Sequence, residues 1–186
     1  HATDFDRRGG KVNPTVFEIE KTGMHVADKI IAVSNLTRNT VIEKYGIHPD
    51  KVVTVYNAVD PITDHEKVRL KRGINDKVVT FLGRITLQKG PEYFVQAAYK
   101  VLQKMDNVRF VMAGSGELLE KMIHWTAALG ISDRLHYTGF LKGDDVFRMF
   151  SISDVYVMPS VSEPFGISPL EAMQSNVPSI ISHQSG

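Results

Sequence analysis

The strongest constraint on the fold is a regular alternation of short apolar runs and helix-like segments from about residue 76 onward. The apolar runs are rich in Val, Ile and Phe and lack polar alternation, which is typical of parallel strands covered on both faces. Strands are predicted at 78–82, 108–112, 134–138, 154–158 and 179–181, and helices at 91–105, 117–129, 145–150 and 169–175. We therefore predict an α/β fold built on a doubly wound parallel sheet.

In such sheets, ligands bind beyond the carboxyl ends of the strands. The four loops that follow the first four predicted strands begin at Gly83, Ala113, Gly139 and Pro159. We expect these loops to meet at one edge of the sheet and to carry the functional residues.

The first 60 residues have a different pattern. Strands are predicted at 29–33 and 52–56, and an exposed helix at 36–44, whereas residues 1–28 are highly charged and show no clear core face. The turn-rich segment 57–61 marks a predicted domain boundary, which divides the chain into 1–60 and 61–186. The chain starts at His1 without an initiator methionine and stops just after an apolar run, so we interpret it as an excerpt of a longer protein.

Composition excludes several classes of function. The net charge of +1 gives no general argument for binding nucleic acid. The absence of cysteine excludes disulfides, thiolate metal sites and cysteine nucleophiles, and it is consistent with a cytoplasmic protein. The seven histidines are scattered without metal-ligand spacing. Asp4-Phe5-Asp6 matches the D-x-D pattern that can hold a divalent metal, but it does not end a recognisable strand, and Arg7 and Arg8 stand beside it. We predict no metal site.

The loop 83–90 follows a buried strand and precedes a helix, and it carries Gly83, Arg84, Lys89 and Gly90. Glycine lets a ligand approach the backbone, while arginine and lysine suit phosphate oxygens. The following helix start adds free N–H groups and a positive dipole end. This loop is a candidate diphosphate clamp, and the alternative is a solvated basic loop.

The segment 160–171 also links a strand to a helix, and it carries Glu163 and Glu171. The Glu163 carboxylate, in the loop, can accept hydrogen bonds from sugar hydroxyls, and Glu171, in the first helical turn, can accept them from ribose hydroxyls. Backbone N–H groups around Gly166 can donate to phosphate or sugar oxygens. For Glu171 the alternative is a capping box with Ser168 at the N-cap and the glutamate at the third helical position. For Glu163 the alternative is a surface charge.

Two further loops carry weaker signals. Residues 113–117 (Ala-Gly-Ser-Gly-Glu) place Gly114 after a strand, but Leu119 stands where a dinucleotide motif needs its third glycine. We interpret this segment as a tight turn whose glycines leave space beside a ligand. In 139–143 the backbone of Leu141 can frame the edge of a flat base, and the alternative is a simple turn.

Together these segments spell G-R-x-x-x-x-K-G, A-G-x-G-E, G-F-L and P-S-x-x-E-P-F-G-x-x-x-L-E-A-M. This ordered set resembles the retaining glycosyltransferases of the glycogen-synthase-like group, the GT-B glycosyl transferases group 1. The resemblance extends from about residue 24 to the end and implies two Rossmann-like domains with the donor between them. Residues 61–186 then correspond to the C-terminal donor-binding domain, incomplete at its end, and residues 1–60 to a remnant of the acceptor-side domain.

The resemblance implies a role for each site residue. Arg84 and Lys89 hold the diphosphate, Glu163 meets hydroxyls of the donor sugar, and Glu171 meets the ribose. His1 corresponds to a histidine kept near the transferred sugar, so the expected catalytic set is Glu163, Arg84, Lys89 and His1. The other positions expected around the donor are Gly83, Gly114, Leu141, Phe165, Gly166 and Ile167.

The implied reaction moves a hexose from a UDP-, ADP- or GDP-sugar to an acceptor hydroxyl with retention of anomeric configuration, without metal or cofactor. The implied partners are the nucleotide sugar and the missing N-terminal domain, with peripheral membrane association of the full protein also open. The alternatives are an epimerase or a sugar phosphate synthase of the same fold, and a donor-binding module inactive as an isolated fragment.

Overall fold

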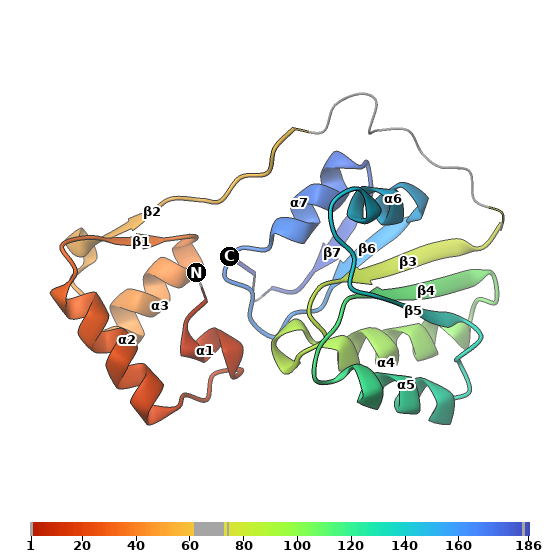
Figure 1. Ribbon diagram of the computed structural model, residues 1–186, viewed down its shortest axis with the longest axis horizontal. Coiled ribbons are helices and arrows are strands. Elements are labelled where there is room, and N and C mark those ends of the chain that lie inside the picture. The colour runs from red at the N-terminus through yellow and green to blue at the C-terminus, as the bar shows by residue number, and fades with distance from the viewer. Residues whose placement is uncertain (1, 62–72, 74, 184) are drawn as a thin grey trace.

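A computed structural model of the chain describes residues 2–61, 73, 75–183 and 185–186 (Figure 1). Two parallel sheets organise these residues. A five-stranded sheet has the order β5-β4-β3-β6-β7, and a two-stranded sheet joins β1 and β2. The strands are β1 (Ile30–Ala32), β2 (Val52–Thr54), β3 (Lys77–Leu82), β4 (Val108–Ala113), β5 (Leu135–Gly139), β6 (Val155–Met158) and β7 (Ser179–Ile181). Each predicted strand is present, with ends that differ by one or two residues.

Helices cover both faces of the five-stranded sheet. Figure 1 shows α4 and α5 on one face and α6 and α7 on the other. Their bounds are α4 (Pro91–Leu102), α5 (Leu119–Ala128), α6 (Asp144–Ile152) and α7 (Ile167–Gln174). On the first face Phe81, Phe94 and Phe110 share a buried cluster, and on the second Phe150 and Tyr156 share another. The predicted doubly wound α/β fold is confirmed.

Strand β3 is the centre of this sheet and the point where the winding reverses. It pairs with β4 on one side and with β6 on the other, both in parallel. The chain therefore builds the β4–β5 side first and then crosses over to build the β6–β7 side. Ligand sites in doubly wound sheets lie at such a reversal, beyond the carboxyl ends of the strands. The loops after β3 and β6 are the ones that flank it.

The first part of the chain has a core of its own, which corrects the expectation that residues 1–28 lack a core face. These residues form α1 (Asp4–Arg7) and α2 (Pro14–Val26). Phe5 packs edge-on against Phe17 and Tyr45, and Phe17 stacks on Tyr45. The apolar residues are spaced too widely among charges for the sequence pattern to reveal this face.

Helix α3 (Asn35–Tyr45) begins where the Ser34 hydroxyl accepts the Thr37 N–H at 3.1 Å, and it is followed by Gly46 in the left-handed conformation. It was predicted to be exposed, but Val41 and Tyr45 are 2% and 1% exposed. The prediction was wrong on this point because one stripe of α3 packs on β1 and β2. The 3-10 turn η1 (Pro49–Lys51) leads into β2.

Candidate functional site

The loops after β3 and β6 are joined by close backbone contacts. The first contains the 3-10 turn η2 (Leu87–Lys89) and ends at Gly90 with φ +64°. A Cβ on Gly90 would lie 2.2 Å from the Pro159 carbonyl oxygen, so only glycine permits this approach. The Val161 N–H donates to the Gln88 carbonyl at 2.8 Å, and the Gln88 amide nitrogen donates to the Ser162 carbonyl at 3.1 Å.

Beside the joined loops lies a cavity of about 280 Å³. It brings together most of the residues predicted for the diphosphate and the sugar. Its lining includes the predicted residues Arg84, Lys89, Glu163, Phe165, Gly166 and Ile167. Ala2, Val33 and Asn57 from the first part of the chain also line it. Both parts of the chain therefore contribute to this cavity, which we call the donor cavity.

Lys89 and Glu163 form an ion pair in the donor cavity. The two side chains are 20% and 9% exposed, so the pair is largely shielded from water. A shielded carboxylate needs a partner, and the lysine supplies it. Arg84 is placed differently, because among the described residues its side chain bonds only the Gln88 amide oxygen, at 3.4 Å from Nη2. Its guanidinium therefore keeps donors for an anionic ligand.

Helix α7 brings its first residues to the same cavity. The helix begins at Ile167 with Gly166 as N-cap at φ +82°, and no side chain caps it. No capping side chain therefore accepts a hydrogen bond from the N–H groups of Ile167 and Ser168, and both residues line the cavity. The capping-box alternative for Glu171 is wrong, because Ser168 lies inside the helix rather than at its cap.

Glu171 lies further along α7 and is absent from the lining of the donor cavity. Burial raises the pKa of its half-buried carboxyl group. Burial also raises the pKa of Tyr156, and the negative charges of Glu163 and Glu171 raise it further. Of the two carboxylates, only Glu163 lines the cavity. The ribose contact of Glu171 stays a prediction.

Gly83 and Gly114 do not line the donor cavity either, and the structure shows another use for them. A Cβ on Gly114 would lie 1.8 Å from the Gly83 carbonyl oxygen, and one on Gly116 would lie 2.3 Å from that of Ile85. The two loops are also joined by the Ile85 N–H, which donates to the Ser115 carbonyl at 2.8 Å. The neighbouring loop fills the space beside these glycines, and a donor contact of Gly83 or Gly114 stays a prediction.

Leu141 packs away from the donor cavity. Its side chain lies against the buried cluster of Val78, Val111 and Met149, on the face of the sheet that carries α6. A backbone contact from Leu141 to the donor base stays a prediction. His1, the remaining predicted catalytic residue, lies outside the described residues, although its neighbour Ala2 lines the cavity.

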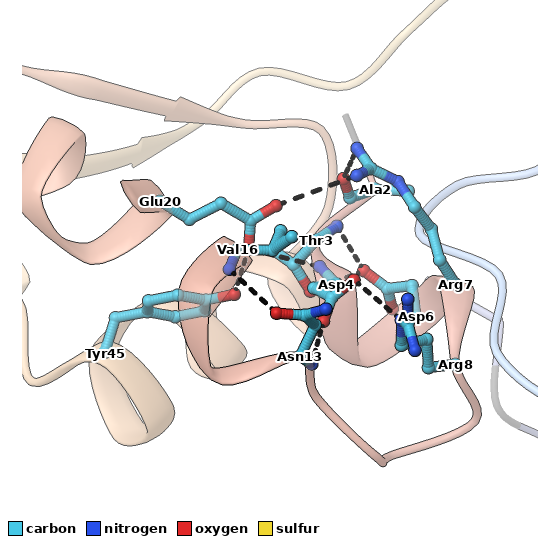
Figure 2. A network of polar contacts seen from close by, with 10 residues as sticks. All are labelled: Ala2, Thr3, Asp4, Asp6, Arg7, Arg8, Asn13, Val16, Glu20 and Tyr45. Atoms are coloured by element: carbon cyan, nitrogen blue, oxygen red, sulfur yellow. Dashed lines mark hydrogen bonds and ion pairs between the residues drawn. The ribbon is translucent and has the colours of Figure 1, made fainter. Parts of the chain in front are cut away.

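The D-x-D match in α1 is explained by hydrogen bonds within the protein (Figure 2). The Asp6 carboxylate accepts the Thr3 N–H at 2.7 Å and its hydroxyl at 2.9 Å, and it also accepts the Ser162 hydroxyl at 2.6 Å. Asp4 accepts the Asn13 N–H at 2.6 Å. Across residues 2–61, 73, 75–183 and 185–186, no group of three or more acidic or histidine side chains is placed to hold a metal ion.

Gln88 is one of the lining residues that sequence reasoning missed. It is 4% exposed and connects Arg84 to the loop that carries Glu163. A signal was present, because a neutral amide stands directly before Lys89 in an otherwise basic loop. Asn57 and Val33 were missed for another reason, since only the approach of the two parts of the chain brings them to the cavity.

Comparison with known proteins matches this arrangement to one family. The model of Glycosyl transferases group 1 matches residues 63–186, and that of Glycosyltransferase Family 4 matches residues 1–62. The chain belongs to the group 1 glycosyltransferases. The predicted family and GT-B fold are thereby confirmed. The domain boundary at residue 60 and the individual site roles stay predictions.

Relatives and solved structures agree with this family. An uncharacterised glycosyltransferase of Methanocaldococcus jannaschii is 32% identical over the whole chain, which covers 51% of that protein. A D-inositol 3-phosphate glycosyltransferase of Salinispora tropica is 30% identical, with coverage of 82% of this chain and 36% of the relative. The chain thus spans about half or less of the length of these curated relatives.

Two solved structures show the same fold. Sucrose-phosphate synthase of Thermosynechococcus elongatus superposes with a TM-score of 0.84 at 19% identity, covering all of this chain and 49% of that one. Anabaena HepE in complex with UDP-glucose superposes with a TM-score of 0.80 at 22% identity, covering 92% of this chain and 50% of that one. In the part of the chain that the structure describes, no helix is both long and apolar enough to span a bilayer.

Proposed function

We propose that this chain forms the donor site of a glycosyltransferase that moves a hexose from a nucleoside diphosphate to an acceptor hydroxyl with retention of configuration. One observation carries the proposal. Arg84, Lys89 and Glu163 line a single cavity together with the uncapped start of α7. Cations and free N–H groups suit a diphosphate, and a carboxylate suits sugar hydroxyls.

The cavity is suited to stabilising a leaving diphosphate. As the bond from the sugar breaks, the sugar becomes oxocarbenium-like and negative charge grows on the departing phosphate. Arg84, Lys89 and the helix start then interact more strongly with the transition state than with the ground state. Each preorganised donor of this kind is worth about 3–4 kcal/mol in favourable cases. The acceptor proton passes to the departing phosphate, so neither a strong protein base nor a metal is required.

The ion pair of Lys89 and Glu163 suggests how the donor is received. A diphosphate competes with the carboxylate for the lysine, and the released carboxylate accepts hydrogen bonds from the donor sugar. One ligand with an anionic part and a hydroxylated part satisfies both partners at once. A nucleoside diphosphate without its sugar satisfies only the lysine, so we expect the sugar to add to the affinity.

The similar proteins support this class of donor. The Anabaena protein was solved with UDP-glucose, and a pneumococcal O-GlcNAc transferase with UDP and GlcNAc. We infer that a UDP-sugar is the first donor to test, with ADP- and GDP-sugars as the alternatives. The epimerase alternative gains no support from the family match. The cytoplasmic location and the peripheral membrane association stay predictions.

The test is thermal stabilisation of the chain by UDP, ADP and GDP and by their glucose conjugates. A ligand at one hundred times its dissociation constant stabilises the folded state by about 2.7 kcal/mol. We expect one nucleotide to stabilise the wild-type chain, and Arg84→Gln to lose most of this effect. Arg148→Gln is the matched control, because Arg148 is 69% exposed on α6 and pairs only with Asp145 in the described structure. Failure of every nucleotide to stabilise the wild type would overturn the proposal.

The excerpt and the longer protein are expected to differ in turnover. Because the chain spans about half of its relatives, acceptor-binding groups are expected beyond it. We predict that the 186-residue chain binds the donor but transfers sugar far more slowly than the longer protein does. Transfer assays on both with one donor check this, and equal turnover would contradict it.

A further inference from the structure

A second cavity, of about 630 Å³, lies between α1 and the loops at the edge of the large sheet. Its cationic lining comes from the first part of the chain, namely Arg7, Arg8 and Lys11. Leu87 and Glu117 line the opposite side. The donor chemistry proposed above uses none of these five residues. We call this hollow the basic cavity.

The two arginines are held in place while much of each side chain remains open to ligands (Figure 2). The Arg7 Nη2 donates to the Ala2 carbonyl at 2.9 Å, and Arg7 Nη1 lies 3.9 Å from Glu20. The Arg8 Nε lies 3.4 Å from the Asp4 carboxylate. The two arginine side chains are nevertheless 53% and 54% exposed. Each guanidinium is thus held by neighbouring groups, while about half of its side chain stays exposed.

The acidic groups in the lining do not cancel this positive charge. The Asp4 side chain is only 5% exposed and is already engaged by the Asn13 N–H and by Arg8. Lys11 is exposed, and within the described ranges its ammonium group forms no hydrogen bond or ion pair, although its backbone N–H donates to the Arg8 carbonyl at 3.3 Å. The lining contains three cations and two carboxylates, Asp4 and Glu117, so its net charge is +1, while Glu20 pairs with Arg7 from outside the lining.

The basic cavity adjoins the donor cavity along two stretches of backbone. Ala2 lines the donor cavity, and its carbonyl oxygen holds Arg7 of the basic cavity. On the other side, Leu87 faces the basic cavity while the next two residues, Gln88 and Lys89, face the donor cavity. A molecule in the basic cavity would therefore lie next to the donor sugar, where an acceptor hydroxyl must be held for transfer.

We propose that the basic cavity binds a phosphate group carried by the acceptor. Arginine presents a planar fork that matches phosphate geometry, and lysine adds a mobile charge. The volume falls within the range of about 300–1,000 Å³ that is usual for small-molecule sites. That the ligand is an acceptor depends on the transfer reaction proposed above, but phosphate binding by this cavity can be tested independently of that reaction. Its source is either a phosphorylated sugar or polyol, or the headgroup of a phospholipid.

The experiment compares glucose 6-phosphate with glucose by titration calorimetry, with saturating UDP present to occupy the donor cavity. We expect the phosphate to raise affinity at least about tenfold, as charge-assisted hydrogen bonds to two or three cations imply. Arg7→Gln and Lys11→Gln should each remove most of this preference and leave UDP affinity unchanged. Arg148→Gln on α6 is the matched control and should leave both affinities unchanged. Lys11→Gln keeps the test valid if Arg7→Gln disturbs folding, because the Lys11 side chain forms no hydrogen bond or ion pair with the described residues.

A second arm uses phosphatidylcholine vesicles with and without phosphatidylinositol. One outcome is that phosphatidylinositol vesicles recruit the wild-type chain but not Lys11→Gln, and that the chain shows no preference for glucose 6-phosphate. This outcome would support the site and assign the phosphate to a lipid headgroup. Equal affinity for glucose 6-phosphate and glucose, with no recruitment, would overturn the proposal. If UDP does not bind, the donor proposal fails, and the same titrations without UDP still decide the phosphate site.

Discussion

Two glutamates eight positions apart on the same segment experience different environments. Glu163 is nearly buried, yet its charge is balanced by Lys89. Glu171 is half buried and forms no ion pair in the described part of the chain, and burial raises its pKa. Glu163 is thus paired with a cation, whereas Glu171 carries an uncompensated cost of ionisation.

That cost predicts how stability depends on pH. Because the pKa of Glu171 is raised by folding, the folded chain holds this proton more tightly than the unfolded chain does. Stability should therefore fall as pH rises from the ordinary pKa of glutamate through the raised one. Glu171→Gln removes the charge, so we expect a higher melting temperature than wild type at neutral pH and no difference in acid. Melting curves across this range check the sign.

The same variant tests the ribose contact. A carboxylate accepts hydrogen bonds from hydroxyls more strongly than an amide does, so Glu171→Gln should weaken nucleotide binding about tenfold. Titration with the nucleotide that stabilises the wild type measures the change. Unchanged affinity would remove Glu171 from the donor site.

Replacing one partner of the Lys89–Glu163 ion pair should lower the stability of the chain more than replacing both partners. Lys89→Met leaves Glu163 shielded and unpaired, which costs about 3 kcal/mol for a buried pair. The double variant Lys89→Met with Glu163→Gln leaves no charge behind and should recover most of that loss. Urea unfolding of the single and double variants measures both steps. A double variant as unstable as Lys89→Met would contradict this account.

At the scale of elements, glycines fix how the loops pack. Gly114 in the loop after β4 contacts the backbone at Gly83 so closely that a Cβ would overlap it, and Gly90 stands in the same relation to Pro159. The loops after β3, β4 and β6 are thus packed together through backbone atoms. The rigid arrangement at the sheet edge depends on positions that do not line the donor cavity themselves.

Gly114→Ala should therefore destabilise the chain strongly, by about 3 kcal/mol or more. Gly130→Ala is the matched control, because Gly130 also has a positive φ, of +69°, but its Cβ would meet nothing within 4 Å. The control should cost only about 1–2 kcal/mol, the penalty of the left-handed conformation. Chemical denaturation of both variants makes the comparison, and equal losses would show that the loop contact is dispensable.

The sequence predicted elements better than it predicted contacts between them. Short runs of apolar residues located all seven strands of the described residues, because a strand buried on both faces requires such a run. The start of α7 was misplaced because Ser168-Pro169 spells a cap, whereas Gly166 provides the turn in the structure. The convergence of Arg84, Lys89 and Glu163 followed from sheet topology. The part played by Gln88 and Asn57 could not be predicted, since it depends on tertiary approach alone.

At the scale of the whole chain, a partly buried hydrogen bond joins the two parts. The Ser162 hydroxyl donates to the Asp6 carboxylate at 2.6 Å, and Ser162 directly precedes Glu163. Asp6 in turn holds Thr3, next to Ala2 in the donor cavity. This bond therefore couples the placement of the first residues to the placement of the sugar-binding carboxylate.

A double-mutant cycle of Ser162→Ala and Asp6→Asn should show this coupling. Residues that share such a contact have interaction energies of about 0.5–3 kcal/mol. The control pairs Asp6→Asn with Ser151→Ala, because the Ser151 hydroxyl is exposed and bonds only the nearby Arg148 carbonyl. Unfolding free energies give both cycles. Strict additivity in the first cycle would show that the two parts are not energetically linked there.

The central place of β3 also affects how the chain is made. Its partner β4 follows within the next thirty or so residues, but β6 comes only after β5 and α6 have been synthesised. At about 5–20 residues per second, one flank of β3 waits several seconds for its neighbour while the ribosome continues. During that interval the nascent sheet offers an open apolar strand, so chaperones have most to protect between the emergence of Leu82 and that of Val155.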